Sequence, residues 1–134
     1  RNLLRWIILK SLGERRNNCM PQTIQTLLTQ YLSEVKKIYG SHLKTVILYG
    51  SYARGVYDEF SDVDIMILLN LDEMELKKYR QQLSEITFDF NMEHDIDIKP
   101  IAKSKELFLK WQESYPFYKN VSREGVTLYR AACL

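Results

Sequence analysis

Two short, largely apolar runs limit the folds open to this chain more than any other feature. The first covers residues 44–49 and ends at Gly50, and the second covers residues 65–69, after an alternating start at Asp62. Short runs of this kind, rich in β-branched residues and bounded by glycine or polar residues, are typical of buried strands. They predict a small sheet with a well-buried centre.

Amphipathic segments precede and follow these runs. Pro21 suits the start of a helix, and apolar residues then recur every three or four positions up to Gly40. The alternation of helices and strands predicts an α+β domain with α/β-like order, in which a small sheet lies in three layers with flanking helices. The expected elements are a helix over 22–39, a strand over 44–49, a helical turn over 51–54, a strand over 62–69, a helix over 72–88, a strand over 95–101, a helix capped by Ser104, a helix ending near Glu124, and a short strand or tail over 126–129.

Length and charge leave few broad classes open. The chain has 134 residues, which fits one domain. Its 19 basic and 17 acidic residues give a net charge of +2, so no overall charge favours nucleic acid. Any polyanion must therefore be held by a local site.

Residues 1–19 have the character of an extension, of natural or cloning origin, and the functional domain is expected over 20–134. The apolar stretch 3–10 is far shorter than the roughly 20 residues that span a bilayer, and no small-residue cleavage site follows it. We therefore expect no membrane association. Cys19 and Cys133 are expected to be free thiols in a reducing compartment, which indicates a cytoplasmic protein.

Two pairs of aspartates alternate with aliphatic residues. Asp62 and Asp64 share one face of their expected strand, and Asp95 and Asp97 share a face of theirs. Neighbouring carboxylates repel one another, and an unpaired carboxylate beside buried apolar residues is costly. A bound magnesium ion would resolve this conflict, because it prefers carboxylate oxygens. Taken alone, the Asp62 pair could equally be a solvated strand end.

The Gly50-Ser51 turn strengthens the hypothesis of a site. Glycine after a buried strand lets the backbone approach a ligand closely, and Ser51 offers a hydroxyl and an N–H to an anion. An ordinary turn is the alternative explanation. Ten residues separate Ser51 from Asp62, which places a phosphate-binding turn beside a metal-binding pair. A third carboxylate, from Asp95 or Asp97, would complete a two-metal clamp for in-line phosphoryl-group displacement.

The stretches Leu48-Tyr-Gly-Ser-Tyr-Ala-Arg-Gly55 and Ser61-Asp-Val-Asp64 resemble the signature of the DNA polymerase β-type nucleotidyltransferase superfamily. The chain is most similar to the minimal nucleotidyltransferases of bacteria and archaea, over about residues 20–130. The stretch 124–129 looks like the usual C-terminal segment of that family. The resemblance implies a small mixed sheet with flanking helices, the nucleotidyltransferase fold, and a nucleoside triphosphate with magnesium as the donor.

The resemblance also implies roles for individual residues. Ser51 would hold the triphosphate, and Asp62 and Asp64 would ligate the metal. The third acid of the family stands between hydrophobic residues, as Asp97 does here, and it would be a metal ligand or the base. Asp95 has the same expected face and register, so it stays an alternative.

Two basic residues near the expected site have open roles. Arg54, at the end of the turn that Gly50 begins, could contact phosphate or position the short helix, or it could pair with Asp58 or Glu59. Lys99 could neutralise a phosphate, although a plain salt bridge is the simpler interpretation.

The favoured function is transfer of AMP from Mg-ATP, or of another nucleoside monophosphate from its triphosphate, to a hydroxyl. Resemblance to the minimal nucleotidyltransferases implies an antitoxin that adenylylates a tyrosine of a HEPN-domain ribonuclease toxin. One alternative is an aminoglycoside-type antibiotic nucleotidyltransferase, although such enzymes need additional C-terminal residues. Another is a non-catalytic module that masks a partner. The aromatic residues in the segment 108–118 would then form an exposed docking face, although we expect them to be part of the core. The oligomeric state stays open.

Overall fold

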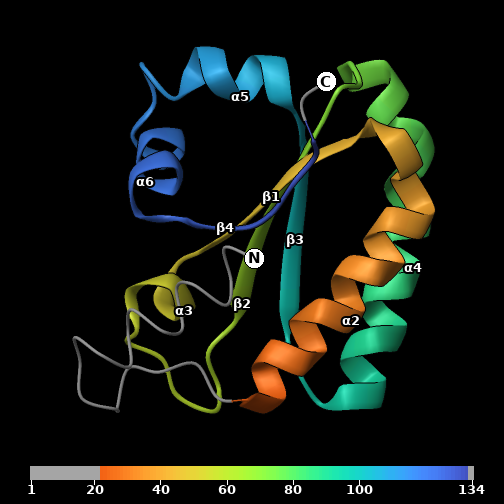
Figure 1. Ribbon diagram of the computed structural model, residues 1–134, viewed down its shortest axis with the longest axis vertical. Coiled ribbons are helices and arrows are strands. Elements are labelled where there is room, and N and C mark those ends of the chain that lie inside the picture. Colours follow the sequence, from red (N-terminus) through yellow and green to blue (C-terminus); the bar gives the residue numbers. More distant parts are fainter. Residues whose placement is uncertain (1–21, 133–134) are drawn as a thin grey trace.

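A four-stranded mixed sheet forms the middle layer of the molecule. The computed structural model describes residues 22–132, so the extension expected over 1–19 lies outside the described residues (Figure 1). The strand order is β3-β2-β1-β4, in which β2 and β3 are parallel and the other pairs antiparallel. The mixed sheet is thus confirmed. The strands are β1 (Leu43–Tyr49), β2 (Val63–Leu69), β3 (Ile98–Ser104) and β4 (Val126–Arg130).

Helices cover both faces of the sheet, as the three-layer prediction requires. Helices α2 and α4 lie side by side on one face, and α5 and α6 lie over part of the other (Figure 1). No helix in the described part of the chain is long and apolar enough to cross a membrane. The helices are α2 (Gln22–Tyr39), the 3-10 turn η1 (Gly40–His42), α3 (Ser51–Arg54), α4 (Glu73–His94), α5 (Lys105–Trp111) and α6 (Pro116–Glu124).

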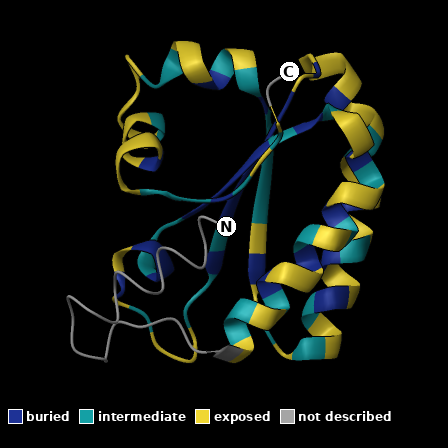
Figure 2. Ribbon diagram, viewed as in Figure 1, coloured by how far each residue is buried: buried dark blue, intermediate teal, exposed yellow. Residues whose placement is uncertain are grey.

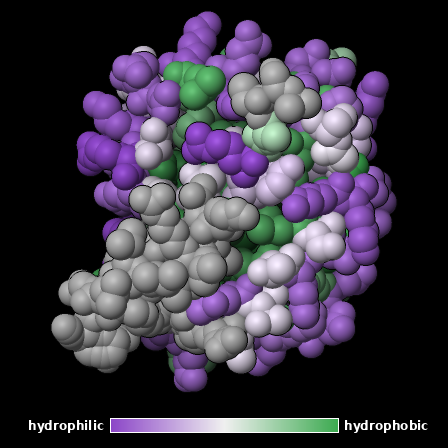
Figure 3. Space-filling model, viewed as in Figure 1, coloured by the Kyte–Doolittle hydropathy of each residue, from purple (hydrophilic) through white to green (hydrophobic). Residues whose placement is uncertain are grey.

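The alternation of side chains along β2 explains its continuous apolar run. Ile65 and Ile67 pack into the larger core beneath α2 and α4, whereas Met66 and Leu68 pack into a smaller core beneath α5 and α6. All four are at most 2% exposed, so each contributes roughly 1.5–3 kcal/mol through burial. In Figure 2 the buried residues of the sheet are mostly those of β1 and β2, and β3 and β4 are mostly of intermediate exposure. Figure 3 shows mostly hydrophilic side chains at the outline of the molecule. The same alternation places Asp64 on the α5/α6 side.

Side chains cap two of the helices, and of these caps the one at Ser104 was predicted from the sequence. The Asp72 side chain accepts a hydrogen bond from the Glu75 N–H at 2.8 Å, and the Glu75 side chain accepts one from the Asp72 N–H at 3.0 Å. Ser104 accepts a hydrogen bond from the Leu107 N–H at 3.3 Å and so begins α5. These bonds satisfy backbone donors that have no partner inside the helix.

The segment between α4 and β3 differs from its prediction. The helix expected to end near Phe88 runs to His94, and the strand expected over 95–101 is β3, Ile98–Ser104. Asp95 adopts a left-handed conformation with φ of 52° and closes α4. The alternation of acidic and aliphatic residues favoured a strand from Asp95. An aspartate tolerates the left-handed conformation well, however, and the turn that it forms makes the strand begin three residues later, at Ile98.

Candidate functional site

The predicted site residues meet at one rim of the sheet. Because β1 and β2 are antiparallel, β1 ends where β2 begins, and the Tyr49 and Asp64 Cα atoms are paired. Strand β3 runs parallel to β2 and begins at this same rim. The Val63 N–H donates a hydrogen bond to the carbonyl of Asp97 at 2.8 Å, so Asp97 is fixed beside the start of β2. Gly50 follows β1 at the same place.

The turn after β1 lies directly against a carboxylate. Gly50 has φ of 76° and ψ of −153°, and a Cβ atom at this position would collide with Oδ2 of Asp64. Ser51 begins α3, and its carbonyl accepts a hydrogen bond from the Val56 N–H at 3.0 Å. Gly55, with φ of 77°, ends the helix after one turn. The single turn of α3 thus begins at Ser51, one residue after the close contact between Gly50 and Asp64.

Three carboxylates lie close enough to interact. The Asp62 carboxyl hydrogen-bonds with that of Asp97, and this contact raises the pKa of Asp62. Burial raises the pKa of the Asp64 carboxyl, and the charge of Asp62 raises it further, against the opposing charges of Lys99 and Arg54. Lys99 Nζ lies 3.6 Å from Oδ2 of Asp97. The rim therefore concentrates negative charge that Lys99 and Arg54 neutralise only in part.

Arg54 pairs with a different acid from those expected. Its Nη1 lies 3.8 Å from Oε1 of Glu124, at the end of α6, and not against Asp58 or Glu59. Asp58 accepts a hydrogen bond from the Phe60 N–H at 2.8 Å within its own loop. The ion pair is half exposed, so its contribution to stability is small. It nevertheless links α3 to α6 across the end of β1.

The prediction that Asp95 and Asp97 share a strand face is wrong, because neither lies in β3. Asp95 closes α4, and its N–H donates to the carbonyl of Asn91. Asp97 stands immediately before β3, where its carboxyl reaches Asp62. Of the two candidates for a third carboxylate, Asp97 is the one that the structure brings into contact with the Asp62/Asp64 pair.

Asn91 positions this segment, although sequence reasoning did not single it out. Its side-chain amide donates to the Ile98 carbonyl at 3.1 Å and accepts from the Ile98 N–H at 3.0 Å. Its backbone carbonyl accepts from the Ile96 N–H at 3.2 Å. These bonds connect the last turn of α4 to the first residue of β3 and so fix where Asp97 lies. An asparagine inside a helical pattern gives no sequence signal for such a role.

Tyr49 is a second residue that sequence reasoning missed. Burial raises its pKa to about 12, with additional contributions from the nearby Asp64 carboxylate and Tyr118. The Phe117 ring stands edge-on to the Tyr49 ring, with 5.7 Å between their centroids. The end of α6 that carries Phe117 therefore borders the carboxylate rim.

The C-terminal aromatic residues divide between core and surface. Phe108 is buried and belongs to the core beneath α5 and α6, and Trp111 is partly buried. Tyr115 and Phe117 are exposed, at 54% and 44%. The expectation that these aromatic residues belong to the core is thus correct for Phe108. It is wrong for Tyr115 and Phe117, whose rings form part of the surface.

The chemistry of the rim fits a magnesium ion. Among residues 22–132, no three acidic, histidine or cysteine side chains are close enough to form a ready-made metal cage. Magnesium commonly takes only one or two protein carboxylates and completes its octahedron with water and substrate phosphate. The Asp62/Asp64 pair matches that requirement.

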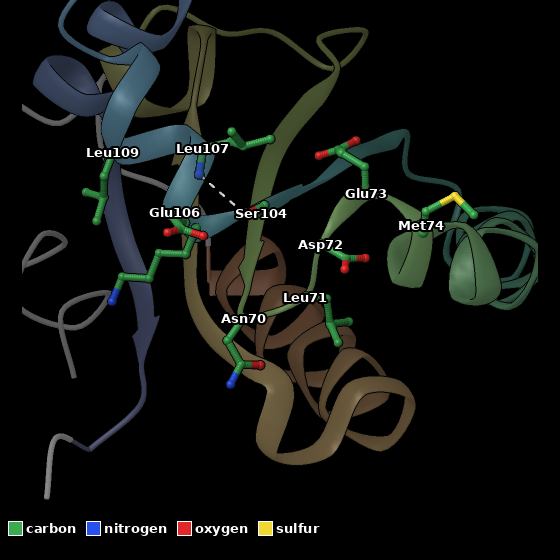
Figure 4. A pocket seen from close by; sticks show the side chains of 10 residues that line it. Asn70, Leu71, Asp72, Glu73, Met74, Ser104, Glu106, Leu107 and Leu109 are labelled. Carbon is green, nitrogen blue, oxygen red and sulfur yellow. Dashed lines mark hydrogen bonds between the residues drawn. The ribbon is translucent and has the colours of Figure 1, made fainter.

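Two hollows lie at opposite ends of the sheet. One, of about 670 Å³, borders the rim and is lined in part by Tyr52, Tyr57, Phe60, Ser61 and Asp97. The other, of about 820 Å³, lies beyond the far ends of β2 and β3, where Figure 4 shows Leu71, Met74, Leu107 and Leu109 around it. The larger hollow contains none of the predicted site residues, so the smaller one is the neighbour of the site.

The glycine-serine turn beside paired carboxylates, at the rim of a mixed sheet, is the arrangement that the resemblance to the nucleotidyltransferases implies. The chain matches the model of the nucleotidyltransferase domain over residues 28–119, and it belongs to this family. It is thus a nucleotidyltransferase, as the sequence predicted.

Known relatives agree with this assignment. The chain is 37% identical over 92 residues to "Putative protein adenylyltransferase MJ0141" of Methanocaldococcus jannaschii, with 66% of the chain and 91% of the relative covered. It is 32% identical over 102 residues to "Putative protein adenylyltransferase MJ0604" of the same organism, covering 76% and 94%. The crystal structure of a putative nucleotidyltransferase from Sulfolobus solfataricus aligns with a TM-score of 0.54 at 17% identity, covering 97% of this chain and 88% of that one, which supports the fold.

Proposed function

We propose that this chain transfers AMP from Mg-ATP to a hydroxyl group of a partner protein. The observation that carries the proposal is the meeting of Asp62, Asp64 and Asp97 beside the Gly50-Ser51 turn. The names of the two Methanocaldococcus relatives, which describe protein adenylyltransferases, favour AMP and a protein acceptor.

In this proposal the turn and the carboxylates bind the donor. The Ser51 hydroxyl and the backbone of the turn hold the triphosphate, and Arg54 exchanges Glu124 for phosphate when the donor binds. Asp62 and Asp64 hold magnesium, which when bound supplies positive charge that stabilises the attacking and leaving oxygens. The carboxylates would otherwise repel the triphosphate, so the ion and the nucleotide are expected to bind together.

Asp97 is the proposed third carboxylate. The acceptor hydroxyl oxygen attacks the α-phosphorus, and the bond from that phosphorus to the bridging oxygen breaks as pyrophosphate leaves. The hydroxyl proton passes to the Asp97 carboxylate, and Asp97 is also one of the residues that line the 670 Å³ hollow. That hollow offers room for an acceptor side chain next to the base.

For the acceptor we propose a tyrosine of a HEPN-domain toxin, with this chain acting as its antitoxin. This follows from the resemblance to the minimal nucleotidyltransferases. The hollow beside Asp97 is lined by the Tyr52, Tyr57 and Phe60 rings, which would suit an aromatic acceptor.

A labelling experiment tests the proposal. The full chain is mixed with magnesium, ATP labelled on the α-phosphate, and a co-encoded HEPN partner. We expect label on the partner, no label when the γ-phosphate carries it, and loss of transfer in the Asp62→Asn/Asp64→Asn variant. A correctly folded wild-type chain that transfers no label to the partner would count against the enzyme proposal.

A binding module is the second candidate, favoured by the exposed Tyr115 and Phe117 rings. Such a module would neutralise a partner by covering it, and catalysis would not matter. The same double variant separates the two ideas. If Asp62→Asn/Asp64→Asn neutralises the partner as well as the wild type does, binding is sufficient.

A further inference from the structure

We infer that the exposed Phe117 ring is the stacking platform for the nucleobase of the donor, and therefore sets how strongly the chain prefers a nucleotide to bare triphosphate. This inference rests on the proposed function, because it takes the triphosphate to bind at the Gly50-Ser51 turn. It concerns the nucleobase of the donor, which neither the carboxylates nor the turn is proposed to bind.

The position of the ring relative to the rim is the first argument. Tyr49 pairs with Asp64 across the strands, and its phenol is close enough for the Asp64 charge to raise its pKa. The Phe117 ring stands edge-on to Tyr49, at 5.7 Å between centroids and an angle of 83°. Phe117 is thus one side chain removed from a proposed metal ligand. That separation suits the part of a nucleotide that extends beyond its phosphates.

Among residues 22–132, the sheet face that holds the carboxylates offers the nucleoside few other exposed aromatic partners. Asp64 lies on the α5/α6 side of β2. Met66, two residues further along β2, lies on the same side and is buried in the core beneath α5 and α6. Phe117, near the start of α6, is the exposed aromatic in contact with Tyr49 at the edge of that cover. A base that lies along the sheet from the rim towards α6 reaches this ring.

The platform is held at a fixed distance from the triphosphate turn. Helix α6 ends at Glu124 and leads through Gly125 into β4, which pairs with β1, the strand that ends at the triphosphate turn. Gly125 then packs so closely on Ile47 and the Val121 carbonyl that a Cβ atom would collide with both. The Tyr118 ring supports Phe117 from within the helix, edge-on at 5.1 Å. A preorganised ring of this kind loses little conformational freedom when a base stacks on it.

The alternative occupant of this ring is a partner protein. A nucleobase accounts better for the proximity to Asp64, because a site for protein docking alone has no need to lie beside a charged rim. Every base has a flat π-face, and stacking on an aromatic ring changes affinity by about ten- to a hundredfold when the ring is removed. The inference therefore predicts a measurable effect of a single side chain.

The test compares Mg-ATP with magnesium tripolyphosphate, which has the phosphates and no base, by calorimetric titration of the full chain. We expect Phe117→Ala to weaken ATP binding by about tenfold or more and to leave tripolyphosphate binding unchanged. Phe117→Leu, which keeps an apolar side chain and lacks the ring, is expected to show most of the same loss. Tyr115→Ala is the matched control, because Tyr115 is also an exposed aromatic residue but contacts Trp111 rather than Tyr49.

Each result bears on the inference. Equal loss for both probes in Phe117→Ala would show a structural role and overturn it. Unchanged ATP affinity in Phe117→Ala would also overturn the inference, and the ring would then be a candidate contact for a partner protein. A wild-type chain that binds ATP no better than tripolyphosphate would overturn it as well. If the wild type binds neither probe with magnesium present, the proposed function fails and the platform fails with it.

Discussion

Gly50 lies so close to the carboxylate of Asp64 that no side chain fits between them. A Cβ atom at residue 50 would overlap Oδ2 of Asp64, and the backbone there has φ of 76° and ψ of −153°, a conformation that is essentially restricted to glycine. The close approach brings the backbone of the proposed phosphate-binding turn against a proposed metal ligand. It also makes Gly50 the most sensitive single position of the rim.

Gly50→Ala should therefore damage both the fold and the reaction. We expect a loss of about 1–3 kcal/mol in the free energy of unfolding, from backbone strain, and at least a hundredfold slower AMP transfer, from displacement of Asp64. Urea unfolding and the labelling assay measure the two effects. Gly40→Ala is the matched control: its φ is 56°, but no atom lies within 4 Å of the added Cβ. It should cost about 1 kcal/mol and leave transfer intact. Normal transfer by Gly50→Ala would contradict the geometry proposed for the rim.

The two candidates for the third carboxylate make opposite predictions. Asp97→Asn removes a carboxylate that contacts Asp62, and we expect transfer to fall by at least about a hundredfold with binding of Mg-ATP largely retained. Asp95→Asn should be close to neutral, because asparagine suits the left-handed position that closes α4. Single-turnover rates for the two variants check this. A large loss in Asp95→Asn with full activity in Asp97→Asn would reverse the assignment.

Patterns that depend on local chemistry were predictable from the sequence. The burial of β1 and β2, the Ser104 cap and the glycine at the start of α3 each follow from side chains within a few positions. The spacing between Ser51 and Asp62 was informative for the same reason, since antiparallel strands bring the end of one beside the start of the next.

The relationships that were missed are long-range or depend on one backbone angle. Nothing near Arg54 in the sequence indicates Glu124 as its partner, because α6 reaches α3 only through the packing of the whole sheet. The left-handed Asp95 overrode an alternating pattern that favoured a strand. Tyr49 gave the signal of an ordinary strand residue, and its place between Asp64 and Phe117 follows from tertiary packing alone.

Asn91 should act as a positioning residue for Asp97. Asn91→Leu removes both hydrogen bonds to the backbone of Ile98, and we expect a loss of about 1–3 kcal/mol in unfolding free energy together with slower transfer. Asn91→Asp keeps an acceptor for the Ile98 N–H and loses the donor to its carbonyl, so it should lie between Leu and the wild type. A structural role alone would lower stability and leave the rate of the folded fraction unchanged. Rates measured well below the melting temperature therefore decide whether Asp97 has moved.

The ionised Asp64 carboxylate should destabilise the chain when no metal is bound. Burial, followed by the charge of Asp62, raises its pKa above the ordinary value of 3.8, so the folded state holds the proton more tightly than the unfolded chain does. The resulting stability is complete below pH 3.8 and is lost as pH rises through the folded-state pKa. At pH 7 that contribution is gone, and the carboxylate remains beside other negative charges.

Asp64→Asn should therefore melt at a higher temperature than the wild type at pH 7 in a chelator, and the difference should shrink as pH falls towards 4. Magnesium with ATP should raise the melting temperature of the wild type and have little effect on the variant, because the variant lacks the charge that holds the ion. Asp89→Asn, at an exposed position of α4, is the control and should follow the wild type in both respects. A variant that melts below the wild type at neutral pH would show that the carboxylate stabilises the fold. The rim would then be a structural charge network, and not a site in which stability is given up for metal binding.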